Sequence, residues 1–124
     1  RALQFFAPGI PQVYYVGMLC GENDLVLLEQ TKQGRDINRH YYSMDEIARE
    51  VERPVVSKLF TLMRFRNENS AFNGDITIEN NSDDRQIAIT HEKHGEFVKI
   101  VADVTTYDFQ ITYSENGKEH MLEL

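Results

Sequence analysis

The stretch from residue 34 to residue 42 holds the densest group of side chains able to bind a ligand or support a reaction. Its candidate residues are Arg35, Asp36, Asn38, Arg39 and His40, followed by two tyrosines. An arginine guanidinium presents five donors in a fixed fork, which suits recognition of a carboxylate or a hydroxyl group. Arg35 is therefore the candidate ligand-binding residue. The alternative is a structural loop, in which arginine–aspartate and tyrosine–backbone contacts hold the segment together.

Two carboxylates, Glu22 and Asp24, are separated by a single residue. Paired carboxylates can act as acid and base, or as acid and nucleophile, when their separation is suitable. The same pair also precedes a predicted helix, and acidic residues at a helix N-terminus are favoured by the helix dipole. The structural role is the stronger interpretation, so neither carboxylate is predicted to be catalytic.

The remaining reactive side chains predict no metal site and no nucleophile. His40, His91 and His94 lack a cysteine partner and the His-Glu-x-x-His spacing of a metal-binding helix. His91 and His94 are expected to be solvated in a turn region. Cys20 has no obvious histidine base, so a packed thiol is expected.

Three elements are predicted before and around the candidate segment. Residues 1–8 are typical of the end of an amphipathic helix, which a Pro-Gly pair stops. Residues 10–16 form a nearly uncharged run of Ile, Val and Tyr, which is typical of a strand buried on both faces of a parallel sheet. Residues 25–32 predict a short helix with Asn23 as its N-cap, and Gly34 is expected in a left-handed conformation after it.

Two further helices are predicted beyond the candidate segment. Ser43 and Glu46 form the pattern of a capping box and predict a helix over residues 44–52. Pro54 suits the first position of a second helix. That helix carries an apolar stripe expected to pack on a sheet. The stripe consists of Val55, Val56, Leu59, Phe60, Leu62 and Met63.

Beyond Asn73 the pattern changes to an alternation of apolar and polar residues. Four or five antiparallel strands, about ten residues apart, are predicted. The turn clusters between them are residues 80–84, 94–95 and 115–117. Asp83 and Asp84 are expected to be solvated in the first of these turns. The sequence therefore predicts two domains, residues 1–73 and residues 74–124.

Composition places the chain among globular proteins, with 41% hydrophobic and 27% charged residues. Its net charge of −7 argues against a nucleic-acid partner, and the whole excess lies in residues 71–124. No apolar run approaches the roughly 20 residues that cross a membrane. A single cysteine fits a reducing compartment, so a cytoplasmic location is expected. The sequence indicates no oligomeric state.

The fold class expected is α/β followed by all-β. The strand, loop and helix over residues 1–73 suit the last strand–helix unit of a (β/α)8 barrel, and the rest suits a small antiparallel domain. A complete barrel of this type needs about 250 residues. Since the chain also starts at Arg1 rather than Met, it is expected to be a piece of a longer protein.

Five stretches carry a resemblance to a known family. Residues 8–17, Pro-Gly-Ile-Pro-Gln-Val-Tyr-Tyr-Val-Gly, resemble the eighth barrel strand of the α-amylase superfamily. Residues 21–24, Gly-Glu-Asn-Asp, together with residues 34–42, Gly-Arg-Asp-Ile-Asn-Arg-His-Tyr-Tyr, are similar to the sucrose phosphorylase family and its close relatives. The similarity continues through residues 53–56 and 64–67, and is weaker in the β region.

The resemblance implies a retaining glucosyltransferase that phosphorolyses sucrose to α-glucose 1-phosphate and fructose. The reaction would pass through a covalent glucosyl-enzyme on an aspartate, with a glutamate as acid and base. These carboxylates lie on earlier strands in the family, so no catalytic residue is assigned here and the piece alone is expected to be inactive. The implied partners are sucrose or a related glucoside and inorganic phosphate, with no cofactor and no metal. Sucrose 6'-phosphate or glucosylglycerate as donor, or hydrolysis instead of phosphorolysis, remain alternatives.

One binding residue carries over from the family. Arg35 matches the arginine that lines the glucose subsite and works there with an upstream aspartate. The neighbours expected to shape its loop are Asp36, Asn38 and Arg39. An alternative of a different class is a non-catalytic, β-rich carbohydrate-binding module. The absence of Trp argues against it, as does the alternation of three aromatic residues with polar ones, typical of core positions. These residues are Phe97, Phe109 and Tyr113.

Overall fold

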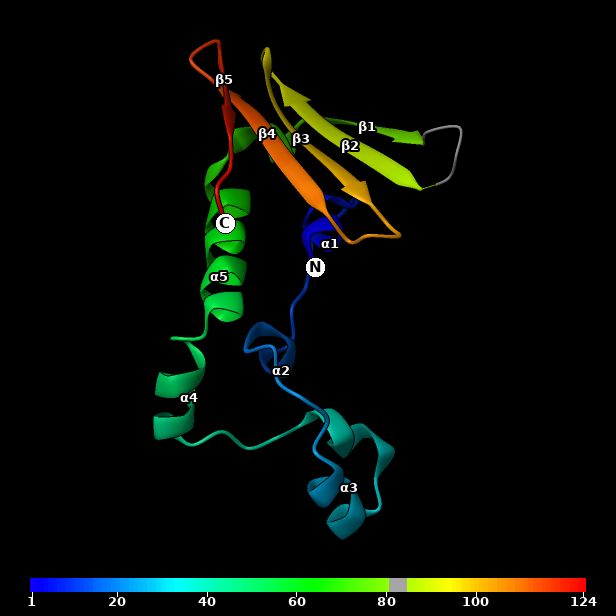
Figure 1. The fold of residues 1–124 in the computed structure, drawn as a ribbon, viewed down its shortest axis with the longest axis vertical. Helices are drawn as coiled ribbons and strands as arrows, with labels where there is room; N and C mark the ends of the chain where they lie inside the picture. The colour runs from blue at the N-terminus through cyan, green and yellow to red at the C-terminus, as the bar shows by residue number, and fades with distance from the viewer. Residues whose placement is uncertain (81–84) are drawn as a thin grey trace. The chain divides into compact units, whose positions relative to one another are not determined.

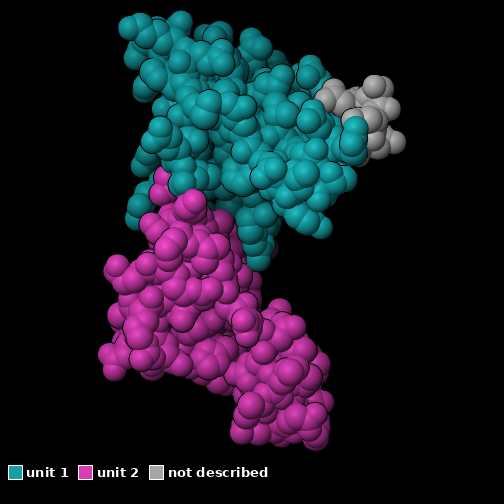
Figure 2. Space-filling view, viewed as in Figure 1, with its two compact units in different colours: residues 1–11, 62–124 teal, residues 12–61 magenta. Residues whose placement is uncertain are grey.

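The computed structural model describes residues 1–80 and 85–124, so the predicted turn with Asp83 and Asp84 lies outside the described residues. The chain forms two compact units (Figure 2). The first, called here the sheet unit, comprises residues 1–11 and 62–124. The second, the helical unit, comprises residues 12–61.

The sheet unit is built on five antiparallel strands in the order β1-β2-β3-β4-β5 (Figure 1). They are β1 (Asp75–Asn80), β2 (Gln86–Lys93), β3 (Glu96–Asp103), β4 (Phe109–Glu115) and β5 (Lys118–Met121). The turn between β4 and β5 places Asn116 and Gly117 at φ of 53° and 72°, which is the geometry that an Asn-Gly hairpin turn favours. The predicted antiparallel β region is therefore confirmed.

The core of the sheet unit lies on one face of the sheet. Ile89, Ile100 and Ile111 are paired across β2, β3 and β4 and are all buried. Two short helices bring aromatic side chains to this core, α1 (Ala2–Phe6) and the 3-10 helix η2 (Ser70–Asn73). Tyr113 on the same face stacks edge-on against Phe65, with ring centroids 5.1 Å apart.

The three aromatic residues that were predicted to be core positions differ in their burial. Tyr113 is half-buried, whereas Phe109 keeps 45% of its surface exposed. Phe97 lies on the opposite face from Val98, because successive residues of a strand point to opposite faces. A period of two identifies the strands but does not state which face is buried.

His91 contradicts the prediction that it is solvated. It lies within β2 and is only 1% exposed. Its Nε2–H donates to the carbonyl oxygen of Phe6 at 2.8 Å, and its ring centroid is 4.9 Å from that of Phe72. Burial lowers the pKa of the His91 ring, so the neutral form is favoured. His94, by contrast, is exposed in the turn before β3, as predicted.

The helical unit contains α2 (Tyr15–Met18), α3 (Leu25–Thr31), the 3-10 helix η1 (Gly34–Asn38) and α4 (Met44–Glu50), and α5 (Pro54–Glu68) begins in it. The predicted strand over residues 10–16 is wrong, because residues 10–14 form no regular element and α2 begins at Tyr15. A strand needs a neighbour for its N–H and C=O groups. All strands among the described residues belong to the antiparallel sheet, so this structure does not show a barrel.

The caps of these helices differ in detail from the prediction. Asp24, not Asn23, caps α3, since its Oδ1 accepts a hydrogen bond from the N–H of Leu27 at 2.8 Å. Lys32, not Gly34, takes the left-handed position after α3, with φ of 56°.

The two later helix starts follow the prediction. The capping box of Ser43 and Glu46 is present at the start of α4, and α4 ends at Glu50 rather than at residue 52. Helix α5 begins at Pro54. Of the predicted apolar stripe, Val56, Leu59 and Leu62 are buried and Phe60 and Met63 are half-buried, whereas Val55 is exposed.

Candidate functional site

The helical unit contains a depression of about 660 Å³ beside the start of α3 and the start of α4. Eleven residues line it: Gly21, Glu22, Asn23, Asp24, Leu25, Val26, His40, Tyr42, Glu46, Glu50 and Arg53. They come from the turn before α3 and its first two residues, from the segment after η1, and from α4 with the turn that follows it. Four of these side chains are carboxylates, so the charged groups of the depression are mainly acidic.

Three hydrogen bonds hold Asp24, one of the residues that line this depression. Its Oδ1 caps α3, while its backbone N–H donates to the carbonyl oxygen of Ile37 in η1 at 2.6 Å. Its Oδ2 lies 2.8 Å from Nδ1 of His40. One residue therefore connects α3, η1 and the segment after η1.

His40 extends this network to the next helix. Its Nε2 lies 3.4 Å from Oε1 of Glu46, a longer and weaker contact than the one to Asp24. The other carboxylate oxygen of Glu46 accepts a hydrogen bond from the N–H of Ser43 at 2.6 Å. The contact with Asp24 raises the pKa of His40, and Glu46 raises it further. Conversely, backbone hydrogen bonds and the contact with His40 lower the pKa of both carboxyl groups.

Two tyrosines pack around His40. The hydroxyl of Tyr15 donates to the carbonyl oxygen of His40 at 3.0 Å. The ring of Tyr42 meets the His40 ring edge-on, with centroids 4.6 Å apart. The Tyr42 hydroxyl also sits against Gly21, where a Cβ atom would lie 2.1 Å from it. Burial raises the pKa of Tyr42, so its hydroxyl stays protonated at neutral pH.

Of the five candidate residues in segment 34–42, His40 lines this depression. The other four, Arg35, Asp36, Asn38 and Arg39, are not among its lining residues. Arg35 is in η1, and its side chain is 66% exposed. Its Nε lies 3.8 Å from Oδ1 of Asp36, whose side chain is 13% exposed. Asn38 is exposed and Arg39 is half-buried. The structure thus leaves the Arg35 guanidinium accessible to a ligand.

The cluster of Asp24, His40 and Glu46 was missed by sequence reasoning, which treated the three residues separately. The available signal was that His40 lies between two helix starts that each carry a carboxylate. Such caps fix the direction in which the carboxylates point. A histidine between them can meet both.

No metal site is evident in the part of the chain that the structure describes, because no group of three or more His, Cys, Asp or Glu side chains is arranged to hold an ion. Cys20 is free and half-buried. Among the described residues, no helix has the length and apolar character required to cross a membrane.

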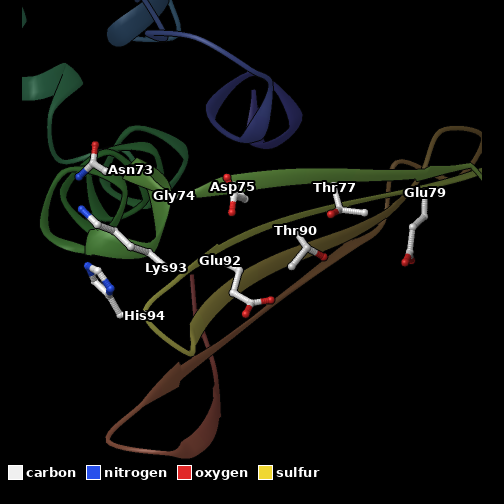
Figure 3. Close-up of a pocket in the computed structure, with 9 residues that line it drawn as sticks. All are labelled: Asn73, Gly74, Asp75, Thr77, Glu79, Thr90, Glu92, Lys93 and His94. Carbon is white, nitrogen blue, oxygen red and sulfur yellow. The ribbon is translucent and has the colours of Figure 1, made fainter.

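A second depression, also of about 660 Å³, lies in the sheet unit at β1 and β2 (Figure 3). Its side chains include the carboxylates of Asp75, Glu79 and Glu92. Its described lining residues include no Phe, Tyr or Trp, so they offer no flat apolar surface on which a sugar ring stacks. The binding-module alternative gains no support from this face of the sheet.

Comparisons with known proteins bear directly on the resemblance. No family model matches the chain. The sucrose 6(F)-phosphate phosphorylase of Thermoanaerobacterium thermosaccharolyticum is 49% identical over 120 residues, which are 96% of this chain and 24% of that protein. The sucrose phosphorylase of Streptococcus mutans is 48% identical over 95% of this chain and 25% of its own length. The glucosylglycerol phosphorylase of Marinobacter adhaerens is 43% identical over 99% of this chain and 26% of its own length.

A solved structure agrees with these relatives. The crystal structure of a sucrose 6F-phosphate phosphorylase from Thermoanaerobacter thermosaccharolyticum matches with a TM-score of 0.92 at 47% identity. The match covers the whole of this chain and 25% of that one. The resemblance to sucrose phosphorylases is therefore confirmed. The chain spans about a quarter of the length of the curated relatives it matches.

Proposed function

We propose that this chain is the C-terminal part of a retaining glycoside phosphorylase related to sucrose phosphorylase. The observation that carries the proposal is the 43–49% identity, over nearly the whole chain, to three proteins named as phosphorylases of glucosyl compounds. Within that enzyme, residues 1–73 would complete a (β/α)8 barrel and residues 74–124 would form the antiparallel domain. The chain has a single cysteine, which cannot form a disulfide within it. This fits a reducing compartment such as the cytoplasm, where thiols stay reduced.

The proposed reaction transfers the glucosyl group of a donor to inorganic phosphate in two displacements. An aspartate first forms a covalent glucosyl-enzyme, and phosphate then takes the glucosyl group with net retention. A glutamate protonates the leaving group in the first step and accepts a proton in the second. Both carboxylates belong to the part of the enzyme outside this chain, so Glu22, Asp24 and Asp36 are assigned no catalytic role.

Arg35 is the residue through which this chain would contact the donor. Its guanidinium is accessible, and it can donate two parallel hydrogen bonds to an oxygen-rich group. We assign it to the non-reducing end of the glucosyl unit, where a charged donor fixes one hydroxyl group. Asp36, Asn38 and Arg39 shape the segment around it. Asp36 is the neighbour placed to orient the guanidinium, at 3.8 Å.

Sucrose is the glucosyl donor that we propose. Relatives named for sucrose and for sucrose 6(F)-phosphate are almost equally identical to this chain, at 48% and 49%, so identity alone does not separate the two donors. Glucosylglycerol is the third possibility, from a relative at 43% identity. The glucosyl half of the donor is common to all three, and Arg35 would contact that half.

The test is a donor panel assayed with the full-length protein that carries these residues. Sucrose, sucrose 6(F)-phosphate and glucosylglycerol are each incubated with inorganic phosphate, and the anomer of glucose 1-phosphate is identified by NMR. We expect the α anomer, with the highest kcat/KM for sucrose. A higher kcat/KM for another donor would reassign the donor, whereas the β anomer would contradict retention. Release of free glucose alone would indicate a hydrolase.

A further inference from the structure

The histidine of the candidate site holds two helix starts together. His40 contacts Asp24 at the start of α3 and Glu46 at the start of α4. The chain between these two carboxylates includes η1 and therefore Arg35. The His40 backbone is anchored as well, through the hydrogen bond from Tyr15. Both ends of the segment that carries Arg35 thus meet at one imidazole ring.

The protonation state of His40 decides how many of these contacts are hydrogen bonds. An imidazolium ring donates from both nitrogens, whereas a neutral ring has one donor and one acceptor. Both partners of His40 are carboxylates that accept hydrogen bonds. Only the charged ring can therefore donate to Asp24 and Glu46 at the same time.

We propose that His40 is a positioning residue for Arg35, and that its protonated ring joins Asp24 to Glu46 and so holds residues 34–42 in the shape that presents the guanidinium to the donor. This inference rests on the proposed function, because it assigns a role at the same glucose subsite. His40 itself does not contact the donor. It acts through the backbone of η1.

The link from His40 to Arg35 runs through Asp24. The Asp24 N–H donates to the carbonyl oxygen of Ile37, which lies two residues after Arg35 in the same 3-10 helix. Fixing the Asp24 side chain on His40 therefore fixes η1 from one side. On the other side, Glu46 is fixed by its capping box with Ser43. Loss of the bridge would free η1 to shift relative to α4.

The other charged groups around the depression also favour the protonated ring of His40. Arg53 forms an ion pair with Glu50, and Glu22 adds a further negative charge to the lining. Tyr42 contacts the ring of His40 and stays neutral, because burial raises its pKa. The surroundings of His40 are therefore acidic overall. They favour the charged ring, in line with its raised pKa.

The raised pKa of His40 sets the pH range over which donor affinity should change. His40 keeps its second proton below its ordinary pKa of about 6.5 and for some distance above it, and loses it as pH rises through the raised value. The bridge is complete at low pH and is lost at high pH. Donor affinity conferred by Arg35 should weaken over the same range. If Arg35 binds the donor equally well in the ground state and in the transition state, losing its contact raises KM and leaves kcat nearly unchanged.

The experiment compares the full-length protein with two matched variants, using sucrose and phosphate from about pH 5.5 to about pH 8.5. His40→Asn keeps one donor for Asp24 but is neutral and cannot reach Glu46. His94→Asn is the control, since His94 is exposed and Asn tolerates its left-handed φ of 55°. We expect His40→Asn to raise KM about tenfold at low pH, with kcat nearly unchanged. The difference should shrink as pH rises, and His94→Asn should follow the wild type.

Glu46→Gln guards against a variant that simply misfolds. Its amide oxygen can still accept from Ser43, so the cap of α4 is kept while the charge is lost. The amide NH2 then faces Nε2 of His40 and can donate to the neutral ring, which still donates from Nδ1 to Asp24. We therefore expect the rise of KM at high pH to disappear, with an unchanged thermal midpoint. An unchanged KM in His40→Asn, or a rise of its KM that is equal at every pH, would overturn the positioning role. A rise of KM at high pH in Glu46→Gln that equals the rise in the wild type would overturn it too. Absence of glucose 1-phosphate from the wild type with every donor would instead overturn the proposed function, and this inference with it.

Discussion

Two histidines of this chain have opposite electrostatic roles, because their surroundings differ. His40 lies between two carboxylates, which raise its pKa. His91 is enclosed by Phe6 and Phe72, and burial lowers its pKa. The first histidine stabilises its folded unit while it is charged, and the second while it is neutral.

The stability of the sheet unit should fall at mildly acidic pH because of His91. Its folded-state pKa lies below the unfolded value of about 6.5, so the unfolded chain binds more protons as pH falls through that value. The contribution is complete above about pH 6.5 and decreases below it. We expect His91→Gln, which can still donate to Phe6, to reduce the loss of unfolding free energy between about pH 7.5 and pH 5.5 by on the order of 1 kcal/mol.

Urea denaturation of this chain at the two pH values measures the effect. His120→Gln is the matched control, because His120 is exposed at the sheet edge. The contribution of His40 runs in the opposite direction but is common to all the proteins compared, so it cancels in the difference. An equal loss of stability in His91→Gln and in the wild type would show that His91 does not titrate as proposed.

Arg35→Ala should weaken catalysis by the full-length enzyme. The substitution removes the guanidinium from the glucose subsite. Its carboxylate partner and one hydroxyl group of the glucosyl unit are then left without a hydrogen-bond partner. We expect a loss of about 2–5 kcal/mol of transition-state stabilisation. Steady-state kinetics with sucrose and phosphate measure this as a fall in kcat/KM. Arg49→Ala is the control, since Arg49 is an exposed arginine on α4. Wild-type kinetics for Arg35→Ala would remove Arg35 from the site.

The turn between η2 and β1 requires a glycine at position 74. A Cβ atom on Gly74 would lie 1.9 Å from the carbonyl oxygen of Glu92, a backbone atom of the neighbouring strand that cannot turn aside. Gly74→Ala should therefore destabilise the sheet unit by about 2 kcal/mol or more, through a forced backbone shift. Gly34→Ala is the control, because no atom lies within 4 Å of its added Cβ.

Urea midpoints of the two glycine variants give the comparison. Gly34→Ala is expected to stay within about 0.5 kcal/mol of the wild type. Equal stability of both variants would mean that β1 can leave β2 without cost, contrary to the observed register of Asp75 with Glu92.

Local sequence patterns predicted most of the helices and strands but not the structure of residues 10–16. The alternation in residues 75–121 and the capping box at Ser43 depend on contacts between near neighbours, so they could be read from the sequence. A parallel strand depends on partners elsewhere, and its apolar run does not state whether they are present. The chain takes a short helix at Tyr15 instead.

Only part of the depression around His40 could be predicted from the sequence, and its connections could not. Residues 34–42 were singled out from their composition and Arg35 from its guanidinium, and the family resemblance points to the same arginine. Its contact with the donor stays a prediction. The bridge of Asp24, His40 and Glu46 depends on which cap residue α3 uses, and the sequence pattern favoured Asn23. An error of one residue at a cap was enough to hide the network.

At the scale of the whole molecule, the chain should be inactive by itself. It corresponds to about a quarter of each relative. We propose that the nucleophile and the acid/base lie outside it. Sucrose phosphorolysis by the purified 124-residue chain should therefore not rise above the rate without protein. Measurable turnover would show that a carboxylate of this chain takes part in the chemistry.

We propose that the enzyme carrying these residues is a glucosyl phosphorylase. The most direct measurement is the initial rate of α-glucose 1-phosphate formation from sucrose and inorganic phosphate by the full-length protein. We predict formation that depends on phosphate and is matched by fructose release in equal amount. Cleavage of sucrose that proceeds equally well without phosphate, or no reaction with any glucosyl donor of the panel, would contradict the claim.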